Sequence, residues 1–249
     1  MIVADLKKIF IDSGHSLNDP GAVGYETERK LNIKISKYMQ EYLLDTYECL
    51  VKLMDETIDS LTVIARTANE WGADIVVSPH MNAGKGNGYE SLVYSWKNKK
   101  LGQIFEKHVK AIGQNSRGVK YRPGLGLLRL TNAPAIITEG AFVDNWSDIK
   151  DWNDDAELKK LGIAYAKATA EFLDLPLKKK ASKTPFKVRV TASSLNIRKG
   201  AGTKYKKVGS IKDKGVYTII EVKGNWGKLK SSTAKSPRWI HLGYTKKLQ

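Results

Sequence analysis

Short apolar runs separated by longer segments of helical periodicity fill the first 175 residues. Runs that end in a polar side chain or a turn predict buried strands, and they lie at 8–12, 48–53, 74–80, 88–95, 125–131 and 133–140. Apolar residues at spacings of three and four predict helices over 27–47, 57–71, 99–113 and, with a break near Trp152 or Asn153, 144–173. Residues 118–122 fit neither pattern clearly. This alternation of strands and helices predicts an α/β domain with a mostly parallel sheet flanked by helices.

The second predicted helix, over 57–71, has one apolar face. Its core-facing positions are expected at Leu61, Ile64, Ala65, Ala68 and Trp71. Gly72 follows directly and is expected to end the helix in a left-handed conformation.

The pattern changes after residue 175. Residues 176–186 (PLKKKASKTPF) are polar, charged and bounded by prolines, which is typical of an extended linker. From 187 to 249, short alternating runs are broken by glycine and no long helical period remains, so this part is predicted to be a small all-β barrel or sandwich. The domains are therefore expected at 1–175 and 187–249.

Composition excludes several classes of protein. The chain has 249 residues, of which 41% are hydrophobic and 27% charged, as in ordinary globular proteins. No apolar run approaches the roughly 20 residues that cross a bilayer, so we expect no membrane insertion. Charges interrupt the first 15 residues where a signal peptide would be apolar, so synthesis in the bacterial cytoplasm is expected. The single cysteine, Cys49, agrees with a reducing compartment.

Charge is divided unevenly between the two parts. Residues 1–175 carry a net charge of −2, and residues 176–249 carry +18. A near-neutral body joined to a strongly basic part indicates that catalysis and anchoring to a polyanion belong to separate domains.

Three predicted strands end in side chains that bind metals or transfer protons: His15, His80 and Glu139. The carboxyl ends of neighbouring parallel strands share one rim, so these residues are expected to converge there. Glu28 opens the helix after the first strand and begins on the same rim, although Glu26 competes with it for this role. Two imidazoles and one carboxylate are the three-ligand set of a catalytic zinc ion.

Other interpretations of these residues stay open at this point. Loop histidines often only form hydrogen bonds, and acids in the first turn of a helix are favoured by its dipole. Glu139 has a structural alternative as a helix cap or as the partner of Arg129. The two remaining histidines, His108 and His241, are expected to be structural.

Four segments together resemble the zinc-dependent N-acetylmuramoyl-L-alanine amidases of the amidase type 3 family. The segments are IDSGHSLNDPGAVG, ERKLN, LTVIARTANEWGADIVVSPHMNA and APAIITEGAFVDNWSD, in the order of that family, and they cover most of residues 8–172. The resemblance implies one zinc ion held by His15, Glu28 and His80, and it implies Glu139 as the catalytic residue. Ser16 and Pro79 depart from the family pattern beside the ligands.

The basic part resembles a bacterial SH3 (SH3b) cell-wall-binding domain. The matching segments are SLNIRKGAGTKYKKVGSIKDKGVYTIIEV, NWGKLK and WIHLGY. The pairing of the two domains is similar to that of phage endolysins, which implies action on bacterial peptidoglycan after release from the host cytoplasm. Anionic wall polymers are the expected partners of the lysines, and Tyr205, Trp226 and Trp239 are candidate wall contacts unless the tryptophans fill the core.

The predicted residues suggest a mechanism, and two alternative functions remain. Glu139 would act as general base and acid, and Asn82 or a backbone donor would stabilise the oxyanion. A zinc peptidase that cuts within the stem peptide is the first rival, although the His-x-x-Glu pair usual in carboxypeptidases is absent. A nucleic-acid-binding protein is the second, and no recognition motif for specific nucleic acid is present.

Overall fold

The computed structural model describes residues 6–178 and 185–248, which fall into two compact units, 1–178 and 179–249. Much of the predicted linker, residues 179–184, lies outside the described residues. Residues 176–178 belong to the first unit, because Leu177 forms a bridge with Tyr47 and the Lys178 amide donates to the Thr46 carbonyl. None of the helices among the described residues has the length and apolar character needed to cross a membrane.

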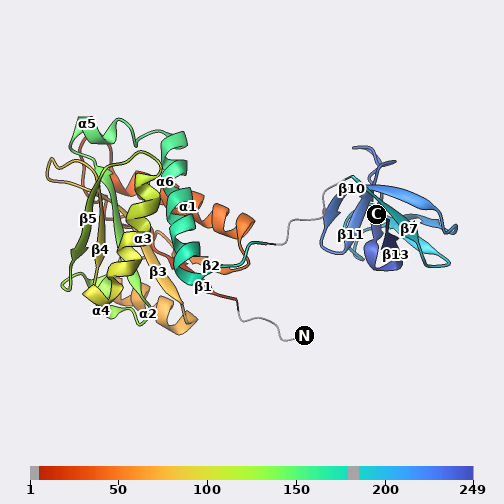
Figure 1. Ribbon diagram of the computed structural model, residues 1–249, viewed down its shortest axis with the longest axis horizontal. Helices are drawn as coiled ribbons and strands as arrows, with labels where there is room; N and C mark the ends of the chain where they lie inside the picture. The colour runs from red at the N-terminus through yellow and green to blue at the C-terminus, as the bar shows by residue number, and fades with distance from the viewer. Residues whose placement is uncertain (1–5, 179–184, 249) are drawn as a thin grey trace. The chain divides into compact units, whose positions relative to one another are not determined.

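The first unit is built on a six-stranded sheet (Figure 1). Its strands are β1 (Lys8–Ile11), β2 (Leu50–Leu53), β3 (Ile75–Asn82), β4 (Tyr89–Val93), β5 (Ser116–Tyr121) and β6 (Ala135–Phe142). They are ordered β2-β1-β3-β6-β4-β5. All neighbours are parallel except β4 and β6, so the sheet is mixed with one antiparallel pair. Of the segment 118–122, which the pattern left open, residues 118–121 belong to edge strand β5 and Arg122 follows it.

Helices cover both faces of this sheet. They are α1 (Glu28–Thr46), α2 (Leu61–Trp71), α3 (Lys99–Lys110), α4 (Gly126–Leu130), α5 (Trp146–Ile149) and α6 (Asp155–Leu173), with a 3₁₀ turn at Trp96–Asn98. Alternation along β1 explains the two layers: Ile9 and Ile11 pack in the core with α1, α3 and α6, whereas Phe10 packs with α2 and α4. The predicted break in the last helix is confirmed, because Asp154 caps α6 by accepting from the Glu157 amide.

Two details of the prediction were wrong. Residues 125–131 were expected to form a strand, but they contain helix α4, in which the adjacent residues Leu127 and Leu128 are both buried. The strand prediction failed because a short apolar run fits a buried helix as well as a buried strand. Leu61 was expected in the core but is 48% exposed, because α2 begins there, after the cap Ser60. Gly72 ends α2 with a φ of 70°, as predicted.

The described residues of the second unit, 185–248, form only β-strands apart from a 3₁₀ turn at Leu242–Tyr244. Its strands are β7 (Phe186–Val190), β8 (Leu195–Arg198), β9 (Lys207–Ile211), β10 (Val216–Lys223), β11 (Trp226–Leu229), β12 (Trp239–His241) and β13 (Thr245–Lys247). They pair antiparallel in the order β13-β7-β10-β11-β12-β8-β9 around a small apolar core. Trp239 is 5% exposed and is therefore no wall contact, whereas Tyr205 is 42% exposed.

Candidate active site

His15 and His80 meet where the loop after β1 crosses the end of β3. The Gly14 amide donates to the carbonyl of Pro79 at 3.1 Å, which ties this loop to β3. A Cβ atom on Gly14 would lie 2.2 Å from Nε2 of His80, so only glycine allows the imidazole this position. His15 itself has a φ of 70°, a conformation that residues with a side chain seldom adopt.

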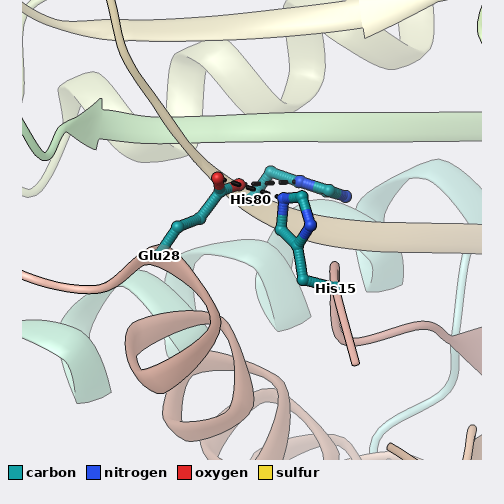
Figure 2. A group of neighbouring side chains, drawn as sticks. All are labelled: His15, Glu28 and His80. Carbon is teal, nitrogen blue, oxygen red and sulfur yellow. Dashed lines mark hydrogen bonds and ion pairs between the residues drawn. The ribbon is translucent and has the colours of Figure 1, made fainter. Parts of the chain in front are cut away.

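Glu28 is the first residue of α1, and each of its oxygens contacts one histidine (Figure 2). Oε1 lies 2.8 Å from Nδ1 of His80 and accepts from the Met81 amide, and Oε2 lies 3.0 Å from Nε2 of His15 and accepts from the Ala22 amide. Glu28 is only 4% exposed, so these partners satisfy a carboxylate that is buried. The structure therefore brings together the three predicted ligands and selects Glu28 over Glu26, which pairs with Lys30 instead.

The donor set fits a zinc ion in chemistry and in spacing. One ligand atom from each of His15, Glu28 and His80 lies within 4.8 Å of the others. Gly21 closes the loop around them with a φ of 68°, and a Cβ atom there would lie 2.7 Å from Oε2 of Glu28. Nδ1 of His15 bonds Asp19 at 2.7 Å, which is the outer contact that commonly orients a metal-binding imidazole.

The two histidines and Glu28 shift one another's pKa values toward the charged forms. The hydrogen bond to Glu28, assisted by Asp19, raises the pKa of His15 to about 9. Burial works against ionisation of Glu28, but its hydrogen bonds to the two histidines outweigh burial and hold its pKa well below the usual range. Glu28 is thus charged, and His15 carries a proton at neutral pH that a metal ion would displace.

Glu139 lies in the middle of the sheet, beside the cluster. It pairs in register with His80 of β3 on one side and with Glu90 of β4 on the other. Burial raises the pKa of Glu139 to about 7; His80 opposes this, and the nearby charges of Glu28 and then Glu90 add to it. Its Oε2 is buried with no hydrogen-bond partner among the described residues, so neither a helix cap nor an ion pair with Arg129 explains it.

Asn82 lies two residues beyond His80, at the end of β3. Its Oδ1 accepts from the Ala83 amide at 2.8 Å, and its Nδ2 lies 3.4 Å from Glu90. Asn82 lines the same cavity as Glu139, but its side-chain amide already has partners in the protein.

Two cavities open at the cluster, and both include His15 and His80. One, of about 310 Å³, has a floor of Ile58, Leu61 and Ile64 with the acids Asp12, Asp19 and Asp59. The other, of about 480 Å³, contains Glu28, Asn82, Glu90, Arg122 and Glu139. The pattern of the sequence did not single out Asp12, Asp19, Glu90 or Arg122. Of these four residues, only Asp19 had an indication in the sequence, because it lies four residues after His15.

Comparison with known proteins agrees with this geometry. The family model described as N-acetylmuramoyl-L-alanine amidase matches residues 9–171. The amidase CwlM of Bacillus licheniformis is 32% identical over 74% of this chain and 75% of its own, and the endolysin of Bacillus phage SPP1 is 32% identical over 69% and 68%. Among solved structures, the amidase of Clostridium difficile 630 superposes with a TM-score of 0.65 and 28% identity over 69% of this chain and 98% of its own. The chain therefore belongs to the N-acetylmuramoyl-L-alanine amidase family, whose substrate is bacterial peptidoglycan.

Proposed function

We propose that the first unit is a zinc-dependent amidase that hydrolyses the bond between the lactyl group of N-acetylmuramic acid and L-alanine. The observation that carries this proposal is the convergence of His15, Glu28 and His80, with Glu139 next to them in the sheet. His15, Glu28 and His80 would hold the zinc ion. The metal supplies Lewis acidity, which polarises a carbonyl group and lowers the pKa of a water molecule.

Residues of the chain would carry out the other steps of the reaction. Glu139, with a pKa of about 7, accepts a proton from the attacking water and then donates it to the alanine nitrogen. The oxygen of that water joins the lactyl carbonyl carbon as the carbon–nitrogen bond breaks, which leaves a carboxylate and a free amine. Asp19 keeps the ring of His15 oriented through its Nδ1. Asn82 is the candidate donor to the developing oxyanion, provided that substrate displaces its contact with Glu90.

The test compares zinc-loaded and chelator-stripped protein on purified cell walls. Removal of the metal should abolish lysis and reloading should restore it. Glu139→Gln should keep its zinc but lose turnover by about 10²- to 10⁴-fold, whereas the control Glu26→Gln, at an acid paired with Lys30, should behave as wild type. Full turnover in Glu139→Gln would exclude the assigned role.

Mass spectrometry of the products separates this reaction from that of a zinc peptidase. Cleavage at the proposed bond leaves a free lactyl carboxyl group on the sugar and an amino-terminal alanine on the peptide. Fragments cut within the stem peptide, with the lactyl amide intact, would show the peptidase instead.

We further propose that the second unit is an SH3-like domain that binds the anionic polymers of the wall. Its support is the +18 charge of residues 176–249, in which Asp213 and Glu221 are the only two acids of the sequence. Full-length protein should bind walls less tightly as salt rises, and less tightly after the wall phosphates are removed. Retention of DNA at a salt concentration that releases the walls would favour a nucleic-acid-binding function.

A further inference from the structure

The two cavities at the metal-binding cluster differ in charge. The smaller one is lined by Asp12, Asp19 and Asp59 and, among the described residues, by no lysine or arginine. The larger one is lined by the carboxyl groups of Glu28, Glu90 and Glu139 and by Arg122, its one lysine or arginine among the described residues. A substrate that spans both cavities therefore meets acids on both sides and a guanidinium only in the larger one.

The position of Glu139 decides which part of the substrate enters each cavity. Glu139 lines the larger cavity and not the smaller one. A general acid must reach the atom that it protonates, which in this reaction is the nitrogen of the departing alanine. The stem peptide, which begins at that nitrogen, should therefore leave through the larger cavity, and the sugar should lie toward the smaller one. This step depends on the proposed function.

Arg122 is placed to recognise a group in that peptide. Its amide donates to the Val93 carbonyl at 2.9 Å, which attaches the residue to the end of β4. Its guanidinium donates to the carbonyl of Tyr121, and no carboxylate pairs with it among the described residues. The neighbouring acid of the cavity, Glu90, is held by Arg117 at 2.7 Å. The Arg122 guanidinium is thus exposed and available for a bidentate contact with a carboxylate.

We propose that Arg122 binds a free carboxylate of the residue that follows alanine in the stem peptide, and so orients the peptide in the larger cavity. A synthetic muramoyl peptide can carry either a carboxylate or a carboxamide at this position. An arginine discriminates between the two because a carboxamide has no charge and only one acceptor oxygen.

The experiment uses full-length, zinc-loaded protein and two soluble muramoyl peptides that differ only at this group, carboxylate against carboxamide. Wild type should favour the carboxylate substrate by about 10-fold in kcat/KM, mainly through KM. In Arg122→Gln the two values should come within about twofold, and Arg122→Lys should be intermediate because it keeps only the charge. The control Arg129→Gln, at an exposed arginine of α4 that lines neither cavity, should keep the full preference.

Several results would overturn the inference. Equal rates of wild type on both substrates would do so, as would a preference that survives Arg122→Gln or an equal loss on both substrates in that variant. Failure of the proposed function has a different signature, because then neither substrate would yield a free lactyl carboxyl group with any form of the protein. Circular dichroism of each variant checks that the fold is intact, and Arg122→Lys repeats the comparison if Arg122→Gln does not fold.

Discussion

The proton on His15 should compete measurably with zinc. Glu28, and then Asp19, raise the pKa of His15 to about 9, so this imidazole is protonated at neutral pH in the metal-free protein. A metal ion takes only the neutral imidazole and must therefore displace the proton. Apparent zinc affinity should rise with pH up to about 9 and then level off, since falling pH restores the competing proton.

The size of this effect follows from the pKa of about 9. At pH 7, two units lower, about 1% of His15 is unprotonated, which weakens the apparent affinity for zinc about 100-fold relative to pH above 9. A histidine with an ordinary pKa near 6.5 would change the affinity by much less over the same interval. Protonation of His80, whose pKa is also raised, adds to the effect in the same direction.

Competition with a chromophoric zinc chelator at pH 7, 8 and 9 measures the affinity, and calorimetry in two buffers of different ionisation enthalpy counts the released protons. Asp19→Asn should reduce the pH dependence, because it removes the negative charge of the carboxylate that bonds His15. The matched control is Asp59→Asn, at an acid of the same cavity that bonds Asn18 instead. Equal affinities at pH 7 and pH 9, or no proton release at pH 7, would refute the reasoning.

Three further outcomes are expected. Glu139→Gln should raise the melting temperature of the metal-free protein at pH 8 and not at pH 4. Burial raises the pKa of Glu139 from 4.5 in the unfolded chain to about 7, so this carboxyl group costs stability as the pH rises above 4.5. The variant should gain about 3 kcal/mol of unfolding free energy at most. Gly14→Ala should abolish zinc binding measured by metal analysis, since its Cβ would lie 2.2 Å from Nε2 of His80. Gly124→Ala, where a Cβ meets nothing within 4 Å, should keep the metal. Asp148→Ala should lower stability in chemical denaturation by about 3 kcal/mol, because Asp148 is 3% exposed and accepts from the amides of Gly88 and Phe142.

Much of the first unit could be predicted because its apolar strand runs end at polar or turn-forming residues, which mark where each strand stops. His15 and His80 follow buried runs, and the parallel neighbours β1 and β3 bring their ends to one rim. The choice between Glu26 and Glu28 could not be made from the pattern alone. Two residues turn a helix by about 200°, so the answer depends on where α1 begins, and helix ends are the least certain part of such a prediction.

The misplaced strand at 125–131 has a different cause. A short apolar run fits a buried strand and a buried helix equally well, and only its neighbours decide. Here β6 already has β3 and β4 on its two sides, so the segment packs Leu127 and Leu128 on the face of the sheet with α2 instead. Arg122 lies in the loop before that helix, where no periodicity exists to indicate which way a side chain points.

The site holds two carboxylates whose environments push their pKa values in opposite directions. Glu28 sits at the start of a helix, where the amides of Ala22 and Met81 and the two imidazoles stabilise its charge. Glu139 sits mid-strand, where its Oε2 has no donor among the described residues and Glu90 is its neighbour in the sheet. A metal ligand must stay charged, whereas a proton carrier must change its protonation state near neutral pH. Glutamate can serve both purposes because the fold gives hydrogen-bond donors to Glu28 and withholds them from Glu139. Exchanging Glu28 for glutamine should therefore remove the metal, and exchanging Glu139 should leave it in place.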